Sequence, residues 1–537
     1  MHVFSLLDAI TDSHHMPQPF DRDQAAARTA DLLAAAKDFG GDVHHAIAAM
    51  LADERGRNLL QAVFGNSPFL SRLALRSPDF LSGLIQAGPS RTMAAISEAL
   101  QKLAQAGLPL PDLARQLRIL RGQAALCIAM ADISGIWDLS AVTGALSEFA
   151  RNILRCTVDA LLLSYAQPGE FMLADPAHPS QHCGYVIIAM GKLGACELNY
   201  SSDIDLIVLF DPESPRYSGR RELPDFQVRF TKALVGLLQD FTGDGYVFRV
   251  DLRLRPDPGA TPIALSVEFA ETYYESAGKG WERAAMIKAR PVAGDIELGR
   301  IFLERISPFI WRRNLDFAAI RDVYEMVGLI RSHHGHAGIT APGHNIKLGM
   351  GGIREIEFFA QTHQLIAGGR DRKLRDPTTL GIIALLQENG QLEPDAAGQL
   401  CEAYIFLRTL EHRLQMIDDE QTQTLPKSPE GLKHLAMFMG YDGTEAFGDA
   451  VRQHLENAAA QFQKLIGQGK EGEPGPNEAA QDFTSRASLQ HLGFTEPDRA
   501  GTIIETWKSF RYRALRRSAS SGRALLTPYN LCELSHG

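Results

Sequence analysis

Two short segments of the chain alternate strictly between charged and apolar side chains, and the first of them constrains the fold most. In this segment Asp203 and Asp205 alternate with Ile204 and Leu206. Successive side chains of a β-strand point to opposite faces. The pattern therefore predicts a strand over 204–210 with one apolar, buried face and one face that carries two neighbouring carboxylates.

The second segment, 248–255, repeats this pattern around a third acid. Its even-numbered residues are apolar and its odd-numbered residues are charged, which predicts a further strand over 246–254. The charged face carries Asp251 flanked by arginines, and Arg253 and Arg255 are candidate phosphate ligands because a guanidinium can bind two phosphate oxygens at once. Taken alone, this motif is equally typical of an edge strand with a ladder of salt bridges, and the aspartate pair of the first segment is more typical of a solvated surface.

The three aspartates together predict a metal-dependent active site. Neighbouring carboxylates repel each other unless a cation lies between them, and Mg²⁺ often takes one or two carboxylates together with substrate phosphates. Asp203, Asp205 and Asp251 are therefore the candidate catalytic residues and the candidate Mg²⁺ ligands. The surface interpretations weaken because three acids and a glycine turn would have to converge by chance.

The glycine turn stands between the two predicted strands at 185–190 and 204–210, with a helix expected over 195–198. Glycine lets the backbone approach a phosphate closely, and the start of a helix offers free N–H donors. The turn therefore supplies candidate nucleotide or phosphate contacts, and a serine hydroxyl next to the first aspartate is a further candidate. The full set of predicted binding residues is Gly191, Lys192, Gly194, Ser202, Arg253 and Arg255.

The rest of the chain has helical periodicity, so the predicted fold class is mostly α, with an α/β core and helical bundle domains on either side. Apolar residues recur at three- and four-residue steps from 22 to 166. Further helices are expected over 226–241, 315–332, 353–366, 395–417 and 446–466. The glycine- and proline-rich stretch 467–480 is typical of a linker. The predicted division is a helical region over 1–135, the core over 136–295, a helical domain over 296–466, and a linker with a C-terminal tail over 467–537.

Charge and cysteine usage exclude several classes of protein. With 54 Lys and Arg against 64 Asp and Glu, the chain of 537 residues has a formal net charge of −10, which argues against nucleic acid as a partner. No signal peptide and no run of ~20 apolar residues that would span a membrane is found. The six cysteines form no C-x-x-C pair, so free thiols in a reducing cytoplasm are expected.

The order of strand, glycine turn, helix, Asp-x-Asp and later third acid resembles the signature of the polymerase-β-like nucleotidyltransferase superfamily. Four longer stretches, 184–211, 247–259, 273–294 and 346–361, closely resemble the bacterial glutamine synthetase adenylyltransferase/adenylyl-removing enzyme, and the resemblance covers nearly the whole chain. That family is a tandem of two nucleotidyltransferase halves. The N-terminal half removes AMP from a tyrosine of glutamine synthetase, and the C-terminal half attaches it.

The resemblance implies a polymerase-β-like core and a phosphorolytic reaction, in which inorganic phosphate attacks the AMP–tyrosine bond and ADP forms. The single module, its long helical lead-in and the block 346–361 resemble the N-terminal, adenylyl-removing half, so the chain is expected to end where the second half would begin. The implied partners are glutamine synthetase, the PII signalling protein, phosphate and a nucleotide, ADP or ATP. Many superfamily members carry Gly-Ser or Gly-Gly where this chain has Gly191-Lys192, so the role of each glycine stays open.

Two other functions stay open. One is adenylyl transfer from ATP to glutamine synthetase, or both activities in a full-length protein. The other is a regulatory module that binds nucleotide or PII without catalysis, against which the intact set of three acids counts. Within 346–361, Arg354 and Glu357 are three residues apart and face the same side of a helix. They are interpreted either as a wall of the active site or as an ordinary ion pair on a helix surface.

Overall fold

The structure is a computed structural model that describes residues 6–10, 16–313 and 339–471. Contacts along the chain define one compact unit over residues 1–463 and a second over 464–537. The predicted four-part division of the chain stays a prediction. Within the described ranges, no helix is long and apolar enough to cross a membrane.

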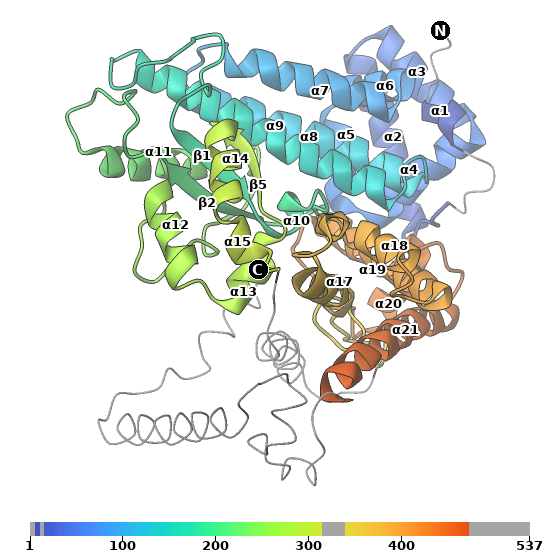
Figure 1. The fold of residues 1–537 in the computed structure, drawn as a ribbon. Coiled ribbons are helices and arrows are strands. Elements are labelled where there is room, and N and C mark those ends of the chain that lie inside the picture. The colour runs from blue at the N-terminus through green and yellow to red at the C-terminus, as the bar shows by residue number, and fades with distance from the viewer. Residues whose placement is uncertain (1–5, 11–15, 314–338, 472–537) are drawn as a thin grey trace. The chain divides into compact units, whose positions relative to one another are not determined.

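Helices fill the chain ahead of the sheet, as the apolar periodicity from 22 to 166 predicts (Figure 1). Their N-termini carry local signals: the Asp21 side chain accepts a hydrogen bond from the backbone N–H of Gln24, and Asp138 does the same for Ala141. The helices are α1 (Leu6–Ala9), α2 (Arg22–Asp38), α3 (Gly41–Ala52), α4 (Glu54–Asn66), α5 (Pro68–Arg76), α6 (Pro78–Ala87), α7 (Pro89–Ala104), α8 (Leu110–Ile133) and α9 (Leu139–Ala166).

A small mixed sheet with the strand order β3-β2-β1-β5 lies at the centre of the α/β core, and a further strand, β4, also pairs with β2. Strand β1 runs antiparallel to both β2 and β5, whereas β2 runs parallel to β3 and to β4. The strands are β1 (Tyr185–Ala189), β2 (Ile204–Phe210), β3 (Val250–Asp251), β4 (Leu265–Ser266) and β5 (Arg290–Gly294). The first two match the predicted apolar runs closely.

The two faces of the sheet pack against different groups of helices. Ile187 and Val208 belong to the core shared with α8, α9 and α11 (Leu223–Gln239), whereas Ile188 and Leu209 belong to a second core with the helices that surround β4 and β5. Those helices are α12 (Val267–Ser276), α13 (Gly280–Met286), α14 (Ile296–Arg305) and α15 (Ser307–Ile310). In Figure 1 the strands accordingly lie between the long N-terminal helices and α12 to α15. Burial on both faces explains why the strands read as continuous apolar runs.

The third predicted strand is much shorter than expected. The alternation over 246–254 predicts a full strand, but only Val250 and Asp251 pair with β2. The backbone N–H of Arg253 instead donates to the Asp251 side chain, and the Arg255 guanidinium donates to nearby carbonyls. These local side-chain bonds compete with the strand ladder, so the charged residues that produce the alternation also end the strand.

A second group of helices follows the sheet. Its members are α17 (Ile353–Ala367), the 3₁₀ turn η1 (Arg372–Arg375), α18 (Thr379–Glu388), α19 (Pro394–Asp418), α20 (Pro429–Phe438) and α21 (Thr444–Glu471). The helices expected over 353–366, 395–417 and 446–466 are confirmed, and the helix expected over 315–332 lies outside the described residues. The linker expected from residue 467 is wrong in its first part, because α21 continues to Glu471. Together with the sheet, these helices confirm the predicted fold class, mostly α with a small α/β core.

Candidate active site

The parallel pairing of β2 with β3 brings the acids of the two alternating segments together. Asp205 and Asp251 are paired residues in this register, and Asp203 lies directly before β2. Burial, together with the negative charges of Asp203 and Asp251, raises the pKa of Asp205 to about 7. The three aspartates therefore form one cluster of negative charge at the start of β2.

The three carboxylates differ in their partners. Asp203 accepts a hydrogen bond of 2.9 Å from the Gln421 side chain. Asp251 is held by Arg253, whose guanidinium lies 2.6 Å from one carboxylate oxygen and whose backbone N–H donates to the other at 2.7 Å. No described residue donates a hydrogen bond to the Asp205 side chain. Asp205 is therefore the acid whose charge is least compensated.

The donor set suits a hard divalent cation, although the present side-chain arrangement is not that of a closed metal site. Among the described residues, no three Asp, Glu, His or Cys side chains are grouped so that they could hold a metal ion. Asp203 and Asp205 offer the carboxylate oxygens that Mg²⁺ prefers, and a cation would relieve their repulsion. Asp251 would join them only by exchanging its contact with Arg253.

The glycine turn directly adjoins the aspartate cluster. Gly191 has φ +52°, and a Cβ atom at this position would lie 2.7 Å from Oδ2 of Asp205. A Cβ on Gly194 would lie 1.9 Å from the carbonyl oxygen of Lys288, so this glycine allows close backbone packing. The helix expected over 195–198 is wrong: the turn itself forms the single-turn helix α10 (Gly191–Gly194). The chain then leaves helical geometry at Cys196, with φ +57°.

Lys192 points into a buried ion pair. Its Nζ lies 3.2 Å from Oε2 of Glu411 on α19, and the exposed fractions of the two side chains are 12% and 0%. Burial lowers the pKa of Lys192 to about 8, because the ammonium loses its hydration, and the Glu411 carboxylate opposes this shift. The predicted phosphate-binding lysine thus already has an anionic partner.

The two predicted phosphate-binding arginines take different positions. Arg253 is about half exposed and paired with Asp251. Arg255 donates to the carbonyl oxygens of Leu252, Pro258 and Thr261 and so holds the loop after β3. Ser202 lies at the limit of hydrogen-bond distance, 3.5 Å, from Asp203. Their predicted role in phosphate binding stays a prediction.

The block 346–361 lies close to the aspartate cluster. The positive charges of Lys347 and Arg354 lower the pKa of Asp205, opposing the effects of burial and of the other acids. Glu357 is only 6% exposed, and burial alone would raise its pKa, yet the surrounding cations Lys288, Lys192, Arg354 and Arg408 hold it at about 2. An ordinary ion pair on a helix surface therefore does not describe Arg354 and Glu357.

Several residues near the cluster were not predicted. Arg408 is fully buried, and it bonds to the Asn199 side chain and to the Glu197 carbonyl oxygen. Glu197 in turn forms an ion pair of 3.3 Å with Lys288, and both of these side chains are buried. A signal was available in 395–417, because Arg408 and Glu411 stand among leucines that recur at helical spacing.

An Asp-x-Asp strand entered from a glycine turn, with a third acid on the neighbouring parallel strand, defines a nucleotidyltransferase-type module. The family model for glutamate-ammonia ligase adenylyltransferase matches residues 57–305, and the model for GlnD PII-uridylyltransferase matches residues 325–466. Over the first of these ranges the chain is similar to the glutamate-ammonia ligase adenylyltransferase family of nucleotidyltransferases.

Curated relatives agree with this assignment. A protein of Rhizobium meliloti named bifunctional glutamine synthetase adenylyltransferase/adenylyl-removing enzyme is 42% identical over 522 residues, which cover 94% of this chain and 52% of the relative. A protein of the same name from Xanthobacter autotrophicus is 44% identical over 479 residues, which cover 88% of this chain and 48% of the relative. The chain therefore spans about half the length of the curated relatives it matches.

Proposed function

We propose that this chain removes AMP from an adenylylated tyrosine of glutamine synthetase by phosphorolysis and releases ADP. The observation that carries the proposal is the cluster of Asp203, Asp205 and Asp251 at the glycine turn. The names of the relatives support glutamine synthetase as the protein substrate. The helical lead-in and the block 346–361 resemble the adenylyl-removing half of that family, which favours removal over transfer.

The reaction exchanges one phosphorus–oxygen bond for another. An oxygen of hydrogenphosphate forms a bond to the phosphorus of the tyrosine-bound AMP, and the bond from that phosphorus to the phenolic oxygen breaks. The products are ADP and tyrosine, whose hydroxyl takes up the proton that hydrogenphosphate carried. Both reactants are anions, so the site must offset charge on the phosphoryl oxygens and on the departing phenolate.

Different residues of the site would bind the cation and orient the phosphate. Asp203 and Asp205 would hold Mg²⁺, joined by Asp251 once its contact with Arg253 is exchanged. When bound, the ion would neutralise charge on the phosphoryl oxygens and the leaving oxygen. Arg253, half exposed beside the acids, would orient the AMP phosphate. Lys192 adds positive charge next to the glycine turn while its pair with Glu411 fixes its position.

We further propose a cellular location, a regulatory partner and a nucleotide for this reaction. A cytoplasmic location is supported by the free cysteines among the described residues. A response to the PII protein and binding of ADP or ATP follow from the same family resemblance. The match of residues 325–466 to the PII-uridylyltransferase model supports a link to PII signalling.

The test follows ADP release from adenylylated glutamine synthetase with the purified chain, Mg²⁺ and inorganic phosphate. Asp203→Asn keeps the side-chain shape and removes charge, and Asp31→Asn on α2 is the matched control because its carboxylate is exposed and outside the site. We expect ADP that depends on phosphate from the parent and from Asp31→Asn, and loss of activity with a retained fold in Asp203→Asn. Full activity of Asp203→Asn would contradict the proposal.

The second candidate is adenylyl transfer from ATP, which the names of the relatives also support because they include both activities. The assay distinguishes the two reactions. AMP transfer from ATP to unmodified glutamine synthetase, without ADP release from the adenylylated form, would identify the transferase. Binding of nucleotide or PII without either reaction would identify a regulatory module.

A further inference from the structure

We propose that Lys347 and Arg354 bind the inorganic phosphate that attacks the AMP–tyrosine bond. This inference rests on the proposed phosphorolysis and names the subsite for its second substrate. The reaction brings hydrogenphosphate next to a phosphodiester that is already negatively charged, so it needs cations that the AMP phosphate does not already occupy. Lys347 and Arg354 are the pair that the backbone holds together beside the aspartate cluster.

The segment that carries Lys347 is tied to the segment that contacts Asp203. The backbone N–H of Ile346 donates to the Gln423 carbonyl oxygen at 2.9 Å, and Asn345 pairs with Thr424 in an antiparallel bridge. Two residues before Gln423, the Gln421 side chain donates to Asp203. Lys347 therefore lies alongside the segment that contacts the first aspartate.

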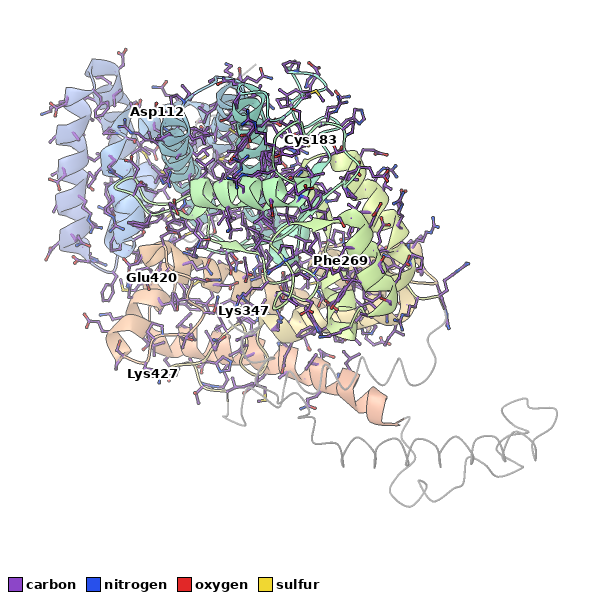
Figure 2. The ribbon with its side chains drawn as sticks, turned by 90° about the vertical axis from the view of Figure 1, so that its left-hand side faces the viewer. Asp112, Cys183, Phe269, Lys347, Glu420 and Lys427 are labelled. Atoms are coloured by element: carbon purple, nitrogen blue, oxygen red, sulfur yellow. The ribbon has the colours of Figure 1, made fainter. Side chains whose placement is uncertain are left out.

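The same segment folds back onto the first turn of α17. The backbone N–H of Arg354 donates to the Lys347 carbonyl oxygen at 3.0 Å, and that of Ile353 donates to the Ile346 carbonyl oxygen at 2.9 Å. The Asn345 side chain accepts the backbone N–H of Lys347 at 3.0 Å. The two cationic residues are thus neighbours in space and are held by backbone hydrogen bonds. In Figure 2, Lys347 lies where the green elements around the sheet meet the orange C-terminal helices.

The Arg354 side chain has the chemistry that an anion requires. Its guanidinium lies 4.9 Å from the centre of the Phe358 ring, and none of the residues in the described ranges accepts a hydrogen bond from it. Its donors are consequently available in a planar fork that matches two oxygens of a phosphate. Lys347 and Arg354 both lower the pKa of Asp205, which is consistent with their positive charges lying near this carboxylate.

Three other cations near the aspartate cluster are held by carboxylates of the protein. Lys192 pairs with the buried Glu411, Lys288 pairs with Glu197, and Arg253 pairs with Asp251. Each of these pairs holds its cation against a carboxylate of the protein. Arg354, by contrast, lies in no ion pair of this kind among the described residues, so its contribution to anion binding does not require breaking a pair.

The test separates affinity for phosphate from affinity for the protein substrate. Arg354→Gln and Lys347→Gln are each expected to raise the KM for inorganic phosphate by ~10-fold or more. The KM for adenylylated glutamine synthetase should change by less than ~3-fold. Arg354→Lys keeps the charge and should recover part of the loss, which a merely structural role of the side chain would not predict. Arg452→Gln, an exposed position on α21, is the control and should change neither constant.

Two results would contradict the proposal that Lys347 and Arg354 bind phosphate. One is a KM for phosphate in Arg354→Gln equal to that of the parent. The other is a parallel rise in both KM values, which would indicate general damage to the site. If the parent releases no ADP, the proposed function fails, and calorimetric binding of inorganic phosphate to parent and Arg354→Gln then decides the subsite. Weaker binding by the variant would support it, and equal binding would overturn it.

Discussion

The side-chain nitrogen of Lys192 lies 3.2 Å from a carboxylate oxygen of Glu411, although 219 positions of sequence separate the two residues. Lys192 belongs to the glycine turn and Glu411 to the middle of α19. Arg408, one turn earlier on the same helix, lies 3.5 Å from the same carboxylate. Glu411 therefore compensates two buried cations at once, and one of them belongs to the turn that adjoins the aspartate cluster.

Removing the charge of Glu411 should destabilise the protein strongly. Glu411→Gln leaves Lys192 and Arg408 buried without their carboxylate, and breaking a buried ion pair in this way typically costs about 3–5 kcal/mol. Denaturant unfolding followed by circular dichroism measures the change. Glu402→Gln, at an exposed position of the same helix, is the matched control and should stay within about 0.5 kcal/mol of the parent. Equal stability of the two variants would refute the prediction.

Activity should fall as the pH rises through about 8, because the pKa of Lys192 is lowered to about that value. Lysine is a base, so it loses its positive charge above its pKa, and the turn then loses a cation. The charged groups that act on Lys192 are Glu411 and Arg408 of α19, together with Lys347 and Glu357.

Lys192→Arg tests this pH dependence, since arginine stays protonated throughout the accessible range. We expect the alkaline fall in kcat to disappear or to move to higher pH in this variant. The pH profile of ADP release from pH 6.5 to 10 measures it. The same alkaline fall in parent and variant would show that another group is responsible.

Alanine at position 191 should impair the active site more than the fold. The new Cβ would lie 2.7 Å from Asp205, at a backbone φ of +52° that L-residues rarely adopt. We expect ~10²-fold lower activity from the displaced carboxylate and a loss of about 1–2 kcal/mol in stability. Gly144→Ala on α9 is the control because its Cβ would meet no atom within 4 Å, and it should be neutral or slightly stabilising. Normal activity of Gly191→Ala would show that the carboxylate can move without cost.

Asp205→Asn should stabilise the metal-free protein, because it removes one of three carboxylates that repel one another. At pH 8 the gain should be on the order of 1–3 kcal/mol, and Mg²⁺ should then raise the melting temperature of the parent more than that of the variant. Thermal unfolding with and without Mg²⁺ measures both effects, with Asp31→Asn as the control. An equal Mg²⁺ shift in Asp205→Asn and parent would argue against a cation at this carboxylate.

The periodicity of apolar residues predicted those helices and strands whose bounds depend on neighbouring residues in the sequence. The strand over 204–210 and the helix over 353–366 follow from apolar periodicity, and the structure places them within one or two residues of the expected bounds. The third strand was predicted too long because its charged residues bond to their own backbone instead of extending the ladder. The alternation of charged and apolar residues predicts which face of the strand is buried, but it does not predict how many residues pair with the neighbouring strand.

The convergence of the acids was predictable, and their surroundings were not. The charged faces of the two segments predicted a shared site, and Asp205 and Asp251 lie in register because β2 and β3 are parallel neighbours. Gln421 and Glu411 approach the site from more than two hundred positions away. Nothing near them in sequence encodes that approach, since it depends on how α19 packs beside the glycine turn.

Helix α19 also limits how the region around the aspartate cluster can be exchanged between relatives. Besides Glu411, it supplies Gln415, whose side chain accepts the backbone N–H of Ser201 at 2.8 Å, just before β2. A chimaera that replaced only 184–295 would import the acids and Lys192 but leave Glu411 and Gln415 behind in the host sequence. The functional building block is therefore discontinuous, and a working transplant must carry the sheet and α19 as one set.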